Sequence, residues 1–315
     1  MSATQASGQA TPSSQRWKVG DVTITKIVES QPLFEIPKLF PSATREAILA
    51  LPWLQPHFVT PDGRGILSIH ALVVDTPTKR IIVDTCVGNG KNRGGWQHYA
   101  NLQTSFLNDL EGAGFARDSF DVVLCTHLHV DHVGWNTMLV DGSWVPTFPK
   151  ARYLLNKTEY EYWAAPLTVP KGNGFDEVQR LTFSDSVKPV FDAGLVDLVD
   201  GTYPVCDEVT LVPTIGHSPG HVSVRISSSG EEALITGDMI HHPSQLAHVD
   251  WCIPQIDFDC DQATKTRVLV FSEVADKPIL VIGTHWAGAT AGRVKRNGNA
   301  FRLECEAQET PQADS

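Results

Sequence analysis

Residues 126–132 read Thr-His-Leu-His-Val-Asp-His and directly follow the apolar stretch 122–125. A lone histidine is usually an ordinary core or surface residue, but here four potential metal ligands lie within six positions. Side chains two residues apart in an extended chain project to the same side, and the turn that follows can present further donors. The stretch therefore predicts a metal-binding loop at the carboxyl end of a strand, able to serve two neighbouring metals. Its candidate ligands are His127, His129, Asp131 and His132.

Three further candidates occur in the second half of the chain, each after an apolar, strand-like stretch. His217 lies in Ile-Gly-His-Ser-Pro-Gly-His, Asp238 in Ile-Thr-Gly-Asp, and His285 in Val-Ile-Gly-Thr-His. Glycine or threonine precedes each one, which allows close backbone approach or a supporting hydrogen bond. Taken singly, each could be a polar strand terminator or a turn residue. Together with residues 126–132 they complete the donor set of a two-metal site.

The chain alternates between strand-like and helix-like stretches in both halves. Apolar residues at alternate positions or in short runs predict strands, and an apolar face predicts helices at 102–112 and 262–275. This order favours an α+β fold in which two sheets pack face to face with helices outside. The predicted strands are 22–28, 66–75, 80–84, 121–126, 209–213, 221–227, 233–236 and 279–283.

Composition and charge narrow the classes of partner. The 315 residues carry a formal net charge of −11 and are 42% hydrophobic and 19% charged, as in ordinary globular proteins. An acidic chain repels nucleic-acid phosphates, whose binding depends on clustered lysine and arginine, so nucleic acid is not an expected partner. No apolar run reaches the roughly 18 residues that a membrane-spanning helix needs, so a membrane is not an expected partner either.

The two ends of the chain are of low complexity, rich in small and polar residues. We expect residues 1–16 and 306–315 to be disordered tails on a single domain spanning 17–305. The first stretch lacks the basic start and apolar core of a secretion signal, which favours a cytoplasmic protein. The six cysteines form no Cys-x-x-Cys pair, so buried free thiols are expected. Cys125, inside an apolar run, is expected to act as a small hydrophobic residue and not as a nucleophile.

Two features leave alternatives open. Residues 30–65 carry six prolines among large aromatic side chains, and form either a loop that packs on the core or a flap that walls a substrate pocket or subunit interface. Several tryptophans are likewise either core residues or walls of an apolar pocket. The tryptophans considered are Trp135, Trp144, Trp163, Trp251 and Trp286.

The pattern His-x-His-x-Asp-His, followed at a distance by His, Asp and His, resembles the metallo-β-lactamase superfamily, whose signature is matched at all seven positions. The resemblance implies an αββα sandwich with the site at one edge, between the sheets. It further implies two metals, one held by three histidines and the other by two histidines and an aspartate, with Asp238 bridging them. The first set is His127, His129 and His217, and the second is Asp131, His132 and His285. The best-known β-lactamases place cysteine at the position of Asp238, so a β-lactam substrate is disfavoured.

Mixed imidazole and carboxylate donors suit zinc, which we take as the default metal, although manganese, iron and cobalt also fit such a site. Asp84 matches a family position that orients the metal-binding loop, and His221 matches a second histidine that we take as structural. His241 and His242 follow the Asp238 stretch and are expected at the surface or behind the ligands. No residue is assigned to an organic cofactor.

The expected chemistry is metal-dependent hydrolysis of a small ester-type substrate. A metal pair lowers the pKa of a shared water from about 15.7 to near 7, giving a hydroxide that attacks carbonyl or phosphorus without a protein nucleophile. Asp131 and Asp238 are the candidate catalytic residues, since their carboxylates can steer the proton afterwards.

Within the superfamily, the stretches 237–243 and 283–288 look most like lactonases and methyl parathion hydrolase. This resemblance implies a lactone of the acyl-homoserine type, with an organophosphate triester as the alternative, and a homodimer as the usual assembly. Some acyl-homoserine lactonases carry a tyrosine between the positions of His217 and Asp238, but residues 218–237 contain none. Lactone opening would therefore need another oxyanion donor.

Other classes are weighed against the same residues. A glyoxalase-II-like thioesterase shares the motif and is a less favoured alternative, because its C-terminal substrate helices are not visible. A flavodiiron-type redox protein has glutamate where this chain has His129, and also needs a flavodoxin domain. A nuclease would need an added nucleic-acid module. A non-catalytic metal-stabilised binding module is disfavoured because no ligand is missing.

Overall fold

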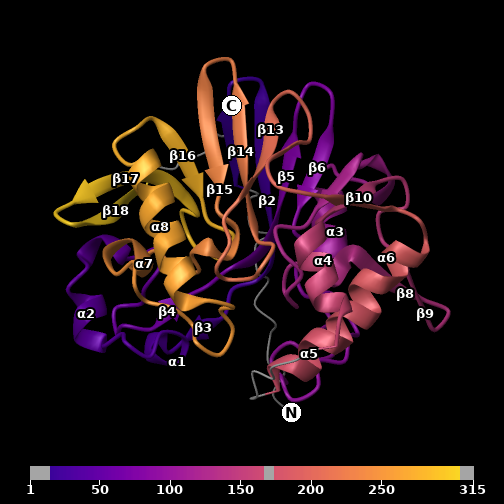
Figure 1. Ribbon diagram of the computed structural model, residues 1–315, viewed down its shortest axis with the longest axis horizontal. Coiled ribbons are helices and arrows are strands. Elements are labelled where there is room, and N and C mark those ends of the chain that lie inside the picture. Colours follow the sequence, from indigo (N-terminus) through magenta and orange to yellow (C-terminus); the bar gives the residue numbers. More distant parts are fainter. Residues whose placement is uncertain (1–14, 167–173, 306–315) are drawn as a thin grey trace, which may run out of the picture.

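Two seven-stranded sheets pack face to face in the computed structural model, which describes residues 15–166 and 174–305 (Figure 1). The first has the strand order β1-β2-β5-β6-β7-β10-β11, with the bounds Arg16–Val19, Val22–Ser30, Ile69–Asp75, Arg80–Val83, Val122–Leu124, Arg152–Asn156 and Val196–Val199. The second has the order β12 to β18, with the bounds Tyr203–Pro204, Val209–Pro213, Val222–Ser228, Glu231–Ile235, Ile279–Ile282, Ala291–Asn297 and Ala300–Cys305. Both sheets contain parallel and antiparallel pairs.

Helices cover the outer flanks of the pair of sheets (Figure 1). On one flank lie α3 (Phe106–Gly112), α4 (Lys157–Ala164), α5 (Phe175–Thr182) and α6 (Lys188–Asp192). On the other lie α7 (Ser244–Ala247) and the long α8 (Cys260–Val274). This αββα arrangement of mixed α and β elements confirms the predicted fold class.

The sandwich follows from strands that are apolar on both faces. In β5, Leu72 and Val74 point into the layer between the sheets, where they meet the inner residues of the second sheet. Ala71 and Val73 point outward and pack with the inner face of α3, including Phe106. Because side chains alternate along a strand, such a run is stable only when both faces are covered.

The proline-rich segment 30–65 forms short elements that pack on the outer side of the second sheet, beside α8. Phe40, for example, is fully buried and stacks on Trp251. The core-packing interpretation of this segment is therefore correct. Its elements are β3 (Leu33–Phe34), α1 (Ile36–Leu39), α2 (Arg45–Leu49), η1 (Pro52–Leu54) and β4 (Gly65–Ile66). The other short elements are η2 (Arg117–Ser119), η3 (Gly134–Asn136), β8 (Thr137–Val140), β9 (Ser143–Pro146), the π-helix η4 (Phe183–Val187) and η5 (Gly237–Met239).

Every predicted strand and helix has a counterpart, and β13 has the predicted bounds. The helix predicted at 102–112 begins only at Phe106, because the backbone of residues 102–104 bonds to residues 89–90 instead. The strand predicted at 66–75 is split, because Ser68 donates its N–H to the carbonyl of His285 and β5 starts at Ile69.

The expectation of free thiols is wrong for Cys252 and Cys260, which form a disulfide with their Cα atoms 5.6 Å apart. A separation of eight residues matches no common motif, and only the fold-back of this loop onto the start of α8 brings the two together. Cys125 is buried among apolar residues, as predicted. Cys206 and Cys305 are free but partly exposed.

The predicted terminal tails lie almost entirely outside the described residues. The exception is at the N-terminal side, where Arg16 already belongs to β1 and pairs with Thr25, so it is not part of a tail. Across residues 15–166 and 174–305, no helix is long and apolar enough to cross a membrane.

Candidate metal centre

All seven predicted ligands meet where several strands of the two sheets end. The motif loop follows β7, and the second sheet contributes His217 after β13, Asp238 after β15 and His285 after β16. Residues that are far apart in the sequence therefore form overlapping donor groups with ligand atoms within 4.8 Å of one another. Six of the seven side chains are buried, and Asp131 is half-buried.

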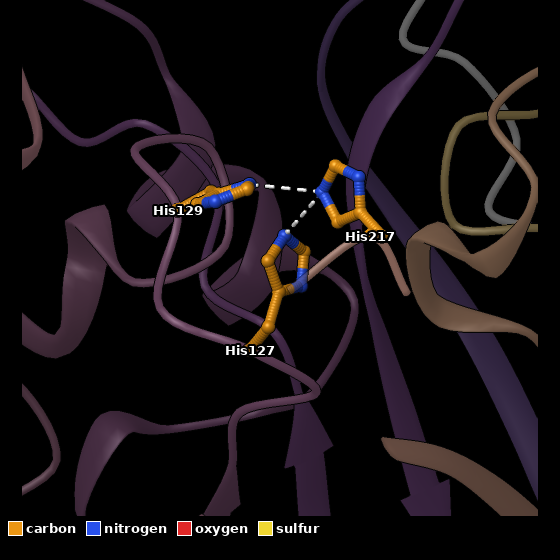
Figure 2. A group of neighbouring side chains, drawn as sticks. All are labelled: His127, His129 and His217. Carbon is orange, nitrogen blue, oxygen red and sulfur yellow. Dashed lines mark hydrogen bonds between the residues drawn. The ribbon is translucent and has the colours of Figure 1, made fainter. Parts of the chain in front are cut away.

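Three histidine rings converge in the first donor group, shown in Figure 2. Nε2 of His217 lies 3.2 Å from Nε2 of His127 and 2.8 Å from Nδ1 of His129. Burial lowers the pKa of all three imidazoles well below the usual value, so they are neutral bases. Neutral imidazole is the form that ligates metals.

The outer nitrogens of these rings show that the group fits a cation. His217 donates its Nδ1 proton to Asp257, and the Nδ1 of His127 faces the Thr126 hydroxyl, whose own proton goes to Asp84. The facing Nε2 atoms of His217 and His127 then both present lone pairs at 3.2 Å, an arrangement that a bound cation would relieve.

The second donor group joins the motif loop to the end of β16. Nε2 of His132 lies 3.1 Å from Nε2 of His285, and the carboxylate of Asp131 lies 3.7 Å and 3.6 Å from these two atoms. His285 donates Nδ1–H to the Ser68 carbonyl, which directs its Nε2 into the site.

Asp238 lies between the two groups. Its Oδ2 is 3.1 Å from Nε2 of His285, 3.2 Å from His132 and 3.6 Å from His217. Burial alone would raise the pKa of this carboxyl, but the surrounding histidines hold it well below its usual range. A charged oxygen thus lies within reach of both donor groups.

Buried partners hold the ligands in place, as is common around metal sites. Asp84 accepts hydrogen bonds from the backbone and hydroxyl of Thr126 and from Nδ1 of His132, in line with the predicted orienting role. His221 accepts the backbone N–H of Asp238 at 2.7 Å, because burial lowers its pKa to about 4 and leaves it neutral. Both residues act behind the ligands.

Two supporting carboxylates were not found from the sequence. Asp257 accepts Nδ1–H of His217 at 2.7 Å. Glu159, fully buried in α4, accepts the backbone N–H groups of Leu128 and Gly220 and so ties the motif loop to the His217 loop. Each has another acid two residues further on, Glu161 and Asp259, and no local pattern distinguishes them from these neighbours.

We expect Asp257→Asn to weaken metal binding by the three-histidine group about 10- to 100-fold, because His217 loses the charged acceptor that fixes its ring. Competition with a chromophoric chelator measures this affinity. Asp250→Asn, which removes an exposed carboxylate from the same region, is the matched control. Equal affinities for both variants and the wild type would contradict the role given to Asp257.

His241 lies closer to the predicted ligands than expected, whereas His242 is neither at the surface nor hydrogen-bonded to a predicted ligand in the described structure. Nε2 of His241 is 3.2 Å from Oδ2 of Asp238, and its ring lines the pocket beside the ligands. His242 is fully buried and bonds to the Phe58 carbonyl and the Ser244 hydroxyl. The turn made by η5 and the extended Ile240 places His241 beside Asp238, three residues earlier.

A pocket opens onto the donor groups and encloses about 520 Å³ of empty space, including the open solvent at its mouth. Leu39 of α1 reaches it, so the proline-rich segment also walls the pocket. None of the five tryptophans considered from the sequence lines it; Trp96 does. Trp286, for instance, is fully buried in the core. The apolar wall comprises Leu39, Leu67, Ile69, Trp96, Val130, Phe175, Ile253 and Ile256.

Tyr99 brings a hydroxyl group to this pocket from a stretch with no motif. Its Oη donates to Oδ2 of Asp131 at 3.2 Å. Burial, together with the carboxylates of Asp131 and Asp238, raises the pKa of the phenol well above its usual value. The hydroxyl is therefore a hydrogen-bond donor and not a base.

Comparison with known families now identifies the chain. The family described as the Metallo-beta-lactamase superfamily matches residues 64–285, a stretch that includes all seven predicted ligands. The chain belongs to this superfamily and is a metal-dependent hydrolase. Comparison with curated protein sequences finds no match.

Solved structures with the same fold include two with a TM-score of 0.78. AidC, described as a dizinc quorum-quenching lactonase in complex with a product, is 21% identical and covers 94% of this chain and 98% of its own. AbOPH, described as a hydrolase in the beta lactamase superfamily, is 22% identical, with 98% and 100% covered. A variant of AiiA from B. thuringiensis, with N-decanoyl-L-homoserine at its active site, has a TM-score of 0.57 and 19% identity over 85% and 94%. At these identities the likeness shows a shared fold.

Proposed function

We propose that this chain is a dinuclear metal hydrolase that opens a lactone of the acyl-homoserine type. The observation that carries the proposal is the position of Asp238. One of its two carboxylate oxygens, Oδ2, lies between the two donor groups, beside an apolar pocket. A carboxylate in this position could bind two metal ions at once.

The donor groups suggest which residues would hold each ion. His127, His129 and His217 would hold one, Asp131, His132 and His285 the other, and Asp238 both. Zinc is the proposed metal, since mixed imidazole and carboxylate donors suit it. When bound, the metal pair would supply acidified water and polarise the substrate oxygen.

The chain's own groups would do the rest of the chemistry. Asp131 and Asp238 are proposed to hold and pass on the proton released by water, because both carboxylates belong to the donor groups and line the pocket. The apolar wall would exclude bulk water and seat an apolar substituent such as an acyl chain.

The charge of the pocket favours a neutral substrate. Among the described residues that line it there is no lysine or arginine. An anionic substrate such as a glutathione thioester would find no cationic side chain to bind its carboxylates. A lactone or a phosphate triester has no such charge, so the triester is the second candidate and the thioester is disfavoured.

The lactone is placed first because two structures of the same fold are described with lactonase activity or an acyl-homoserine ligand. By resemblance, a homodimer completes the proposal. The cytoplasmic location expected from the N-terminal stretch is not kept, because the Cys252–Cys260 disulfide counts against a reducing compartment, where disulfides are rare. Light scattering of the purified protein tests the dimer.

The deciding experiment combines metal analysis with hydrolysis of hexanoyl-homoserine lactone, methyl parathion, S-lactoylglutathione and a cephalosporin, before and after chelation. We expect about two metals per chain and lactone turnover that falls at least about 100-fold on chelation and returns with zinc. A metal-free active enzyme would overturn the metal centre, and one metal per fully active chain would overturn the dinuclear site. Turnover of methyl parathion alone would replace the lactone by the triester.

A further inference from the structure

The pocket contains few polar groups that are not predicted metal ligands. Among the described lining residues, His241 and Tyr99 each bring a polar atom within 3.2 Å of a carboxylate of the donor groups. Nε2 of His241 is directed at Oδ2 of Asp238. Tyr99 contacts the second donor group through Asp131, to which its hydroxyl donates.

We propose that the Tyr99 hydroxyl is the catalytic hydrogen-bond donor to the carbonyl oxygen of the substrate. This inference rests on the proposed function and specifies a residue for it. The 3.2 Å bond from Oη to Oδ2 of Asp131 places the hydroxyl at the edge of the second donor group, on the wall of the same pocket. The hydroxyl has one proton, so it would turn from Oδ2 of Asp131 to the carbonyl oxygen of a substrate that reaches the donor groups through this pocket.

Tyr99 lies in the loop formed by residues 91–101. This loop is held in place by bonds at its ends, and a catalytic donor requires such fixed placement. Arg93 is fully buried and forms a two-pronged ion pair with Asp185 of η4, at 2.7 and 3.2 Å. The backbone of Asn101 donates to the Lys91 carbonyl at 2.7 Å, which closes the loop between them. The ends of the loop are thereby anchored to the first sheet's flank.

Ring contacts fix the side chain itself. The Tyr99 ring lies 4.2 Å from the ring of His98 and 6.1 Å from that of Trp96. Trp96 in turn packs against Phe175, which is 5.4 Å from the ring of His129. This chain of rings links Tyr99 to the first donor group along the pocket wall.

The hydrolytic step balances with Tyr99 as a donor that keeps its proton. The oxygen of water bonds to the carbonyl carbon, the bond from that carbon to the ring oxygen breaks, and the proton of water passes to the released alkoxide. Negative charge builds on the carbonyl oxygen in between, and a preorganised hydroxyl stabilises it most at that point.

The test is Tyr99→Phe, which keeps the ring and removes only the hydroxyl. Loss of one such donor should lower kcat about 100-fold, with KM changed less than about threefold. Binding of N-hexanoyl-L-homoserine, whose carboxylate would accept the same bond, should weaken about tenfold. Metal affinity should stay that of the wild type. Tyr162→Phe on α4, outside the pocket lining, is the matched control and should change none of these values.

Two results would overturn the inference. Unchanged kcat in Tyr99→Phe would remove the donor role. A loss of kcat that excess metal restores would show that Tyr99 only orients Asp131. If the wild type hydrolyses neither lactone nor triester, the proposed function fails, and Tyr99 is then judged by binding of N-hexanoyl-L-homoserine, where unchanged affinity rejects it and a matched loss supports it.

Discussion

Asp238→Ala is expected to lower kcat/KM for the lactone at least about 1000-fold, equivalent to about 4 kcal/mol of transition-state stabilisation. The variant should also bind about one metal fewer per chain. Oδ2 of Asp238 lies within 3.6 Å of histidine nitrogens from both donor groups, so alanine removes the only described oxygen that both groups share.

Metal content by mass spectrometry and initial rates at saturating zinc measure the two effects separately. Asp250→Ala removes an exposed carboxylate and should behave as the wild type. Circular dichroism controls for folding, and Asp238→Asn, which keeps the contact with the Thr284 hydroxyl, serves where alanine unfolds the chain. Two metals and full activity in both variants would reject the shared-ligand role.

The convergence of the seven predicted ligands could be predicted because each of the segments that carry them follows a strand. Apolar runs ending in a polar residue, as before His127 and His285, show where a chain leaves a sheet, and the ends of neighbouring strands meet. The same alternation predicted the strands themselves. The disulfide could not be predicted, since neither Cys252 nor Cys260 has a local partner pattern.

The pocket and the supporting groups depend on tertiary arrangement. Tyr99 and Trp96 belong to a loop that is held by the pairing of Arg93 with Asp185, 92 residues later in the chain. Glu159 meets the motif loop only because α4 packs beside β10, which itself pairs with β7. The spacing of apolar residues predicts single helices and strands. It does not predict contacts between elements that are distant in the sequence.

The position of His241 was predicted only in part. The histidine lies three residues after Asp238, beyond η5, which ends at Met239, and after Ile240, which is extended. The strand predicted at 233–236 has its counterpart in β15, but no pattern in the sequence predicted the conformation of the turn that follows. A local difference in backbone conformation therefore decides whether this histidine faces the site.

Gly134→Ala is the second large effect that we expect, and it acts on stability. Gly134 follows the motif loop and donates its N–H to the Cys86 carbonyl at 2.7 Å. A Cβ atom at this position would lie 1.8 Å from the carbonyl oxygen of Val87 and 2.0 Å from its carbon. Backbone atoms cannot rotate away, so the two loops must separate.

The cost should be about 3 kcal/mol or more, because overpacking against backbone is among the strongly destabilising changes. In a chain of this size the midpoint of thermal unfolding should fall by about 5 °C or more. Gly112→Ala, where a new Cβ meets nothing within 4 Å, should leave it unchanged or raise it. Separation of the loops would also pull Asp84 away from His132, so metal affinity should fall together with stability. A variant that melts like the wild type would show that this junction is not tightly packed.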